Sequence, residues 1–191
     1  MRASASTSMS PLHPAIAEAA HRADASAIGL IDLGGANLGV DRVRISYSNG
    51  QALGDPSAPV RIECSTRGDR AIPERALPEV LARVAVDQPE DVADAIAGVP
   101  ADALPVVITT WALSRVSLER RLRFLHALDA GRPVAWVSAE GVGVAPSIPT
   151  LGDRRASGHS IVGLALLDRS TVRAEAVGRC WSRGRFLAWL A

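Results

Sequence analysis

The residues best suited to ligand chemistry follow a short apolar run early in the chain. Ala27–Leu33 reads AIGLIDL, which has the length and apolar composition of a strand buried on both faces of a sheet. Asp32 lies near its carboxyl end, and Gly34 and Gly35 follow. In open α/β sheets, ligands bind outside the carboxyl ends of the strands, and the first such junction commonly binds a nucleotide. This stretch therefore predicts the first strand of a Rossmann-like sheet and a ligand site over Asp32–Gly35.

Two more predicted strand ends carry candidate binding residues. Asp87 ends the apolar run Val80–Asp87, where a carboxylate can accept hydrogen bonds from both ribose hydroxyls of a nucleotide. Alternatively, Asp87 is a helix-entry acid before Pro89, with backbone N–H groups as its partners. Thr110 and Trp111 end a later β-branched run. Trp111 either stacks on an adenine or a substrate, or belongs to the core.

Glu140 is the candidate catalytic residue. Ser138 and Glu140 close the strand that follows, and if the strands are parallel, both are expected to face one crevice with Thr109–Trp111. There Glu140 would act as a base or bind a substrate amine. Alternatively, Glu140 is only a turn residue before Gly141. No Ser-His-Asp arrangement, phosphate loop or metal cluster is detectable in the sequence.

The elements that must hold these residues alternate between strand and helix. The predicted strands are 27–33, 40–48, 59–65, 80–87, 104–110, 133–138, 160–167 and 171–180. The predicted helices are 12–25, 89–99 and one after Ser117 with Leu118, Leu122, Leu125 and Leu128 on its apolar stripe. Strands 40–48 and 59–65 are expected to form a hairpin, and 181–191 an apolar cap. This order predicts a doubly wound, mainly parallel Rossmann-like α/β sheet that a C-terminal antiparallel hairpin closes.

Composition limits the classes of function. The chain has 191 residues, 48% of them hydrophobic, and a formal net charge of +1, which predicts one domain over 12–191 after a disordered tail over 1–11. Arginines are scattered among acids, which favours a solvated surface over nucleic-acid binding. The sequence has neither a secretory signal nor the ~18-residue apolar run of a membrane helix, so we expect a cytoplasmic protein without membrane contact.

The cysteines and the first histidines are expected to be without a catalytic or ligating role. Cys64 and Cys180 match no zinc spacing and no CxxC pair, so we expect two idle thiols in a reducing compartment. His13 and His21 lie eight residues apart on the first predicted helix. We expect both on its surface.

Five stretches of the chain resemble a bacterial family known only as a domain of unknown function: 31–60, 78–87, 100–116, 133–146 and 178–190. The tryptophans and the Ala-Glu-Gly turn make this resemblance fairly specific. The core of the family looks like an S-adenosylmethionine-dependent methyltransferase, whose chemistry is unassigned. The resemblance thus implies a methyltransferase-type Rossmann fold, S-adenosylmethionine as cofactor and an unknown acceptor.

The sequence departs from the family pattern near the expected cofactor site. Its glycine loop reads Asp32-x-Gly34-x-Ala36-x-Leu38, so only the first glycine of the pattern acid-x-Gly-x-Gly-x-Gly is in register. Compared with that pattern, the sequence also lacks a few residues before Asn37, a segment after Asp87 and an N-terminal helical part. These departures leave a second hypothesis open, a non-catalytic Rossmann-like binding or scaffolding domain. A nicotinamide cofactor would require a fuller G-x-G-x-x-G loop.

Overall fold

A computed structural model describes residues 12–169, 171–181 and 186–191, so the predicted tail 1–11 lies outside the described residues. The strands are β1 (Ala27–Leu33), β2 (Val43–Tyr47), β3 (Ala52–Leu53), β4 (Val60–Thr66), β5 (Glu79–Val86), β6 (Leu104–Thr110), β7 (Val134–Gly141), β8 (His159–Asp168), β9 (Thr171–Trp181) and β10 (Phe186–Trp189). The helices are α1 (His13–Arg22), α2 (Val92–Ala97) and α3 (Leu118–Ala127), with 3₁₀ turns η1 (Val40–Arg42), η2 (Pro89–Asp91), η3 (Leu113–Arg115) and η4 (Arg155–Ser157).

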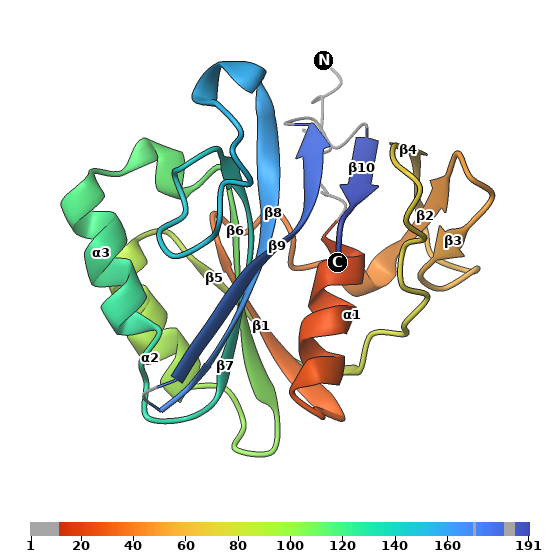
Figure 1. The fold of residues 1–191 in the computed structure, drawn as a ribbon. Helices are drawn as coiled ribbons and strands as arrows, with labels where there is room; N and C mark the ends of the chain where they lie inside the picture. The colour runs from red at the N-terminus through yellow and green to blue at the C-terminus, as the bar shows by residue number, and fades with distance from the viewer. Residues whose placement is uncertain (1–11, 170, 182–185) are drawn as a thin grey trace, which may run out of the picture.

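All the strands join one sheet in the order β3-β2-β4-β10-β9-β8-β7-β6-β1-β5 (Figure 1). β5, β1, β6 and β7 are parallel neighbours in this order, and α2 connects β5 to β6 while α3 connects β6 to β7. From β1 the chain passes through β2, β3 and β4 in the other half of the sheet, returns to β5 on one side of β1, and then crosses to β6 on its other side. The fold is therefore α/β, with a large, mostly parallel sheet and antiparallel strands toward the C-terminus.

The predicted C-terminal hairpin exists, but it does not close the sheet. β8 and β9 pair antiparallel from His159–Trp181 to Asp168–Thr171, in agreement with the prediction. The segment expected as an apolar cap instead contributes β10, which pairs antiparallel with β9 and parallel with β4. Leu187 and Trp189 are buried and alternate with half-buried residues, the pattern of a strand. An internal strand also provides backbone partners for both of its neighbours, which a cap would not.

The hairpin expected between 40–48 and 59–65 is wrong, because β2 and β4 pair in parallel. The turn at Asn49-Gly50 leads instead into the short β3, which runs antiparallel to β2 and returns the chain to the start of that strand. Gly54 makes this return possible: its φ is +85°, and a Cβ there would lie 2.0 Å from the carbonyl oxygen of Val43. β4 can then begin beside β2 and run in the same direction.

The helix α1 packs against one face of the sheet and is largely buried, contrary to the surface position expected for both of its histidines. Every residue from His13 to Ala20 is buried, and only His21 lies on the surface as expected. Small side chains such as Ala15 and Ala19 let the helix pack closely against the strands. Figure 1 shows α1 on one side of the strands and α2 and α3 together on the other.

The face that carries α2 and α3 has its own apolar cluster. Phe124 of α3 meets Trp136 of β7 edge-to-face, with ring centroids 5.3 Å apart. Leu128 is buried as expected, but Leu118 and Leu122 of the predicted stripe are 64% and 47% exposed. The stripe prediction is wrong there because Phe124, not these leucines, anchors the helix. In the described part of the chain, no helix is both long and apolar enough to cross a membrane.

Candidate functional site

Asp32 lies at the carboxyl end of β1, as predicted, but it is fully buried. Its carboxylate accepts a 2.5 Å hydrogen bond from the backbone N–H of Asn37 and longer 3.3 Å bonds from the Asn37 side-chain amide. Burial raises the pKa of Asp32, and the hydrogen bonds from Asn37 oppose that rise. The loop after β1 therefore folds back onto the acid that precedes it.

Asn37 links the ends of the neighbouring parallel strands β1 and β6. Besides bonding Asp32, its Nδ2 donates to the Thr110 hydroxyl at the end of β6, at 3.0 Å. The structure thus brings Asp32 and Thr110 together as predicted, but through a third residue. Asn37 was not among the predicted site residues. Its only signal in the sequence is that it follows a glycine pair and matches an asparagine in the family pattern.

The glycine pair gives the loop its shape. Gly34 has a φ of +104° and Gly35 a φ of +73°, values that side-chain-bearing residues rarely adopt. The N–H of Gly34 donates to the carbonyl of Val86 at 2.9 Å, which ties the loop to the end of β5. A Cβ built on Gly34 would meet no described atom within 4 Å. The outer side of this turn is therefore open to approach by a ligand.

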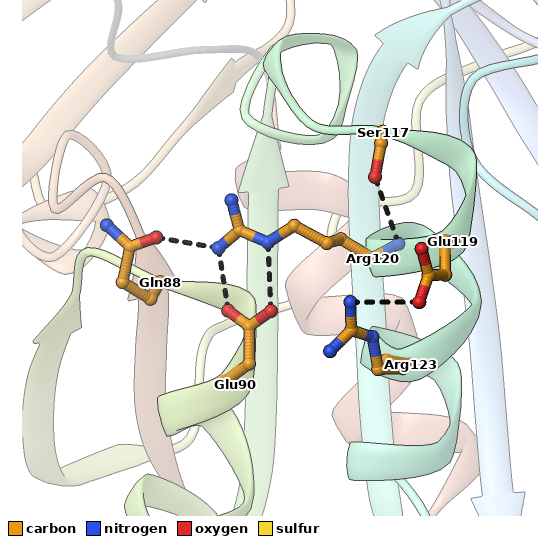
Figure 2. Close-up of polar contacts among 6 residues, drawn as sticks. All are labelled: Gln88, Glu90, Ser117, Glu119, Arg120 and Arg123. Atoms are coloured by element: carbon orange, nitrogen blue, oxygen red, sulfur yellow. Dashed lines mark hydrogen bonds and ion pairs between the residues drawn. The ribbon is translucent and has the colours of Figure 1, made fainter.

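Asp87 follows β5 directly and its side chain is exposed. The chain just after it is fixed by Arg120 of α3 (Figure 2). The guanidinium donates to both carboxylate oxygens of Glu90, at 2.8 and 2.7 Å, and to Oε1 of Gln88 at 2.7 Å. The hydrogen bond from Arg120 lowers the pKa of Glu90 to about 2. Arg120 thus positions the backbone beside Asp87 at the same edge as Gly34.

Trp111 follows β6 in a left-handed conformation, with a φ of +54°. Its N–H donates to the carbonyl of Ala139 at 3.1 Å, and its carbonyl accepts from the Ser114 hydroxyl at 2.8 Å. Non-glycine residues held in this region concentrate at ligand-binding and catalytic sites. The ring is half-buried and lies near Gly141.

Thr109, Ser138 and Glu140 do not face a shared crevice with Thr110. All three are fully buried on the face that packs against α2 and α3, whereas Asp32 and Thr110 lie toward the other face. The expectation is wrong because successive side chains of a strand point to opposite faces. The ends of parallel strands meet at one edge of the sheet, but their successive side chains point to its two opposite faces.

Glu140 bonds to the backbone of the next turn. One of its carboxylate oxygens accepts the N–H of Leu113 at 3.0 Å, which places a carboxylate at the start of η3. Burial raises the pKa of Glu140 to about 7, against the lowering effect of backbone hydrogen bonds. The geometry gives Glu140 a role in holding η3 and, through it, the turn that contains Trp111.

The expectation of two unpaired thiols is confirmed, since Cys64 and Cys180 are both free and buried. They lie on β4 and β9, with β10 between them. Burial raises the pKa of Cys64 to about 11 and that of Cys180 to about 12, so neither is a reactive thiolate near neutral pH. Among the described residues, no group of three or more histidine, cysteine or acidic side chains is arranged to hold a metal ion.

The chain belongs to the family described as "Uncharacterized protein conserved in bacteria (DUF2332)", which matches residues 7–95 and 87–189. The two matched stretches overlap over residues 87–95, which begin at Asp87, the residue after which the resemblance places an absent segment. No curated protein matches the chain, and no solved structure does.

Proposed function

We propose that the protein binds S-adenosylmethionine over the carboxyl ends of β5, β1 and β6, as a methyltransferase-like protein with an unknown acceptor. The observation that carries the proposal is the Asp32–Asn37–Thr110 connection at the carboxyl ends of the adjacent parallel strands β1 and β6, the edge at which open α/β sheets bind ligands. In this arrangement Gly34 offers open backbone to the cofactor. The exposed carboxylate of Asp87 is suited to the ribose hydroxyls, and Trp111 to a ring of the ligand.

A second candidate is a non-catalytic Rossmann-like module that binds or scaffolds a partner. The burial of the candidate cofactor-binding acid and of the candidate catalytic acid favours this alternative. Asp32 and Glu140 are both fully buried and bonded to neighbouring residues of the chain. Glu140 therefore supports η3 and takes no part in the proposed cofactor site.

The deciding experiment is calorimetric titration of the folded protein with S-adenosylmethionine and S-adenosylhomocysteine. We expect saturable binding, weakened by at least about tenfold (1.4 kcal/mol) in Asp87→Asn. Asp91→Asn, which changes another exposed acid of the same segment, is the matched control and should bind like the unaltered protein. Absence of heat and of thermal stabilisation would favour the non-catalytic module. Equal binding by both variants would remove Asp87 from the site.

A further inference from the structure

A cavity of about 590 Å³ lies away from the predicted site residues, where the amino end of α1 meets β3 and the chain before β5. This volume is within the range of small-molecule sites. Its lining residues are His13, Asp41, 52–55 and 74–80. The cavity therefore joins segments that are distant in the sequence, and it lies apart from the candidate site.

His13 is the most enclosed polar side chain of the lining, with 2% of its surface exposed. Its Nδ1 is buried without a hydrogen-bond partner in the described part of the chain. Burial lowers the pKa of His13 to about 4, and the nearby charge of Asp41 only partly opposes this. The imidazole is therefore neutral near pH 7 and keeps one donor and one acceptor nitrogen.

Asp41 brings a negative charge beside this ring. One of its carboxylate oxygens pairs with Arg83 of β5, while Oδ1 is buried without a partner among the described residues. A buried carboxylate oxygen without a donor is costly, so a hydrogen-bond donor at this position would be stabilising. A ligand with a positively charged donor satisfies both the charge and the orphaned oxygen.

Three other charged groups of the lining are already paired. The Asp55 carboxylate accepts from Ser57, and Glu74 accepts from Gln51. Arg75 donates to Glu18 at 2.7 Å. Leu53, Leu77 and Val80 supply apolar wall. With Glu79, the lining holds four carboxylates against one guanidinium, which favours a cation over an anion.

We propose that this cavity binds a small alkyl amine, with its ammonium group on Oδ1 of Asp41 and within reach of the imidazole of His13. The alkyl chain lies against the leucines of the wall. The proposal is independent of cofactor binding at the carboxyl edge, because none of the residues proposed to hold the cofactor lines the cavity.

The test uses n-butylammonium as the probe, with butan-1-ol and butanoate as neutral and anionic controls of matched length. The readout is the ring nitrogen shift of His13 by NMR in histidine-labelled full-length protein, assigned with His13→Gln. We expect a saturable shift with n-butylammonium only. Equal effects of butan-1-ol, or no shift at all, would overturn the proposal.

Two variants separate charge recognition from damage to the fold. Asp41→Asn should weaken the binding of n-butylammonium by at least about tenfold, because it removes the charge of the side chain and keeps its shape. Arg83→Gln removes the competing partner of Asp41 and should bind the probe at least as tightly as the unaltered chain. Melting curves of both variants show whether they fold. If Asp41→Asn does not fold, weaker binding in folded Arg83→Gln still contradicts the proposal.

Discussion

Asn37 makes Asp32 an internal acceptor of the β1 loop. The asparagine is nearly fully buried, and its backbone N–H and side-chain amide both donate to the same carboxylate. An acid at a strand end that looks like a ligand group from the sequence is thus also a structural centre. Substitution of Asp32 therefore tests stability before it tests binding.

We expect Asp32→Ala to lower the free energy of unfolding by about 2 kcal/mol, because it leaves buried donors of Asn37 without an acceptor. The comparison is Asp87→Ala, which changes an exposed acid at the neighbouring strand end and should stay within about 0.5 kcal/mol. Urea denaturation of the two variants measures both values. Similar losses in the two would show that the bonds to Asn37 contribute little.

Glu140 should make stability depend on pH. Its pKa rises from 4.5 to about 7 in the folded protein, so between these values the native state binds more protons than the unfolded state. Stability contributed by this group therefore falls as pH rises from about 4.5 to 7. Glu140→Gln keeps an acceptor for Leu113 and removes the titration.

The unfolding free energy of Glu140→Gln, relative to the unaltered protein, should therefore increase across this pH range by on the order of 3 kcal/mol. Denaturation series at several pH values measure it. Asp32, whose pKa burial also raises, titrates in both proteins and cancels in the difference. A difference that does not change with pH would mean that Glu140 is not desolvated as described.

β7 and β8 are packed together without room for an extra methyl group at their centre. Gly163 of β8 pairs with Ser138 of β7. A Cβ on Gly163 would lie 2.6 Å from the Ser138 hydroxyl and 2.7 Å from a methyl group of Ile148. Both contacts are closer than real side chains allow, so the strands or the loop beneath them would have to move.

We expect Gly163→Ala to destabilise the protein by about 1–3 kcal/mol through overpacking. Gly98→Ala is the matched control, because Gly98 has a helical φ of −78° and a Cβ there would only meet carbonyls at 3.6 Å. That variant should be neutral or slightly more stable. Thermal melting distinguishes the two, and equal melting temperatures would refute the packing argument.

β10 holds the two halves of the whole sheet together. It is hydrogen-bonded to β9 on one side and to β4 on the other, so among the described strands it connects the ladder of β2, β3 and β4 to the rest of the sheet. Leu187 and Trp189 of this strand are buried in the cluster that also contains α1. The last segment of the chain is thus structural for the entire molecule.

Trp189→Ala should lower the free energy of unfolding by about 3–5 kcal/mol, as truncations of other buried aromatic side chains do. Trp181→Ala is the control, because that side chain is 42% exposed at the end of β9 and should cost much less. Chemical denaturation measures both losses. If the two tryptophans cost the same, β10 is not the connection that the topology indicates.

Local patterns were sufficient for the elements around the candidate site. The apolar run 27–33, the β-branched run 104–110 and the serine before α3 are all found as the sequence predicts, with the Ser117 hydroxyl accepting from the N–H of Arg120. These signals depend on residues within one turn or one strand, so the local sequence is enough to predict them. The acid and glycines of Asp32–Gly35 are also a local pattern, and this pattern predicted their position at the end of a strand.

By itself the sequence determined where most of the strands and the three helices form and which acids end the strands, because periodicity and capping are short-range. Only the tertiary structure decided that β4 pairs parallel to β2, that β10 enters the sheet and that His13 is buried beside Asp41. It also decided that Glu140 is enclosed. Pairing partners and burial depend on contacts between residues far apart in the chain, and no local pattern records which of several compatible strands will meet.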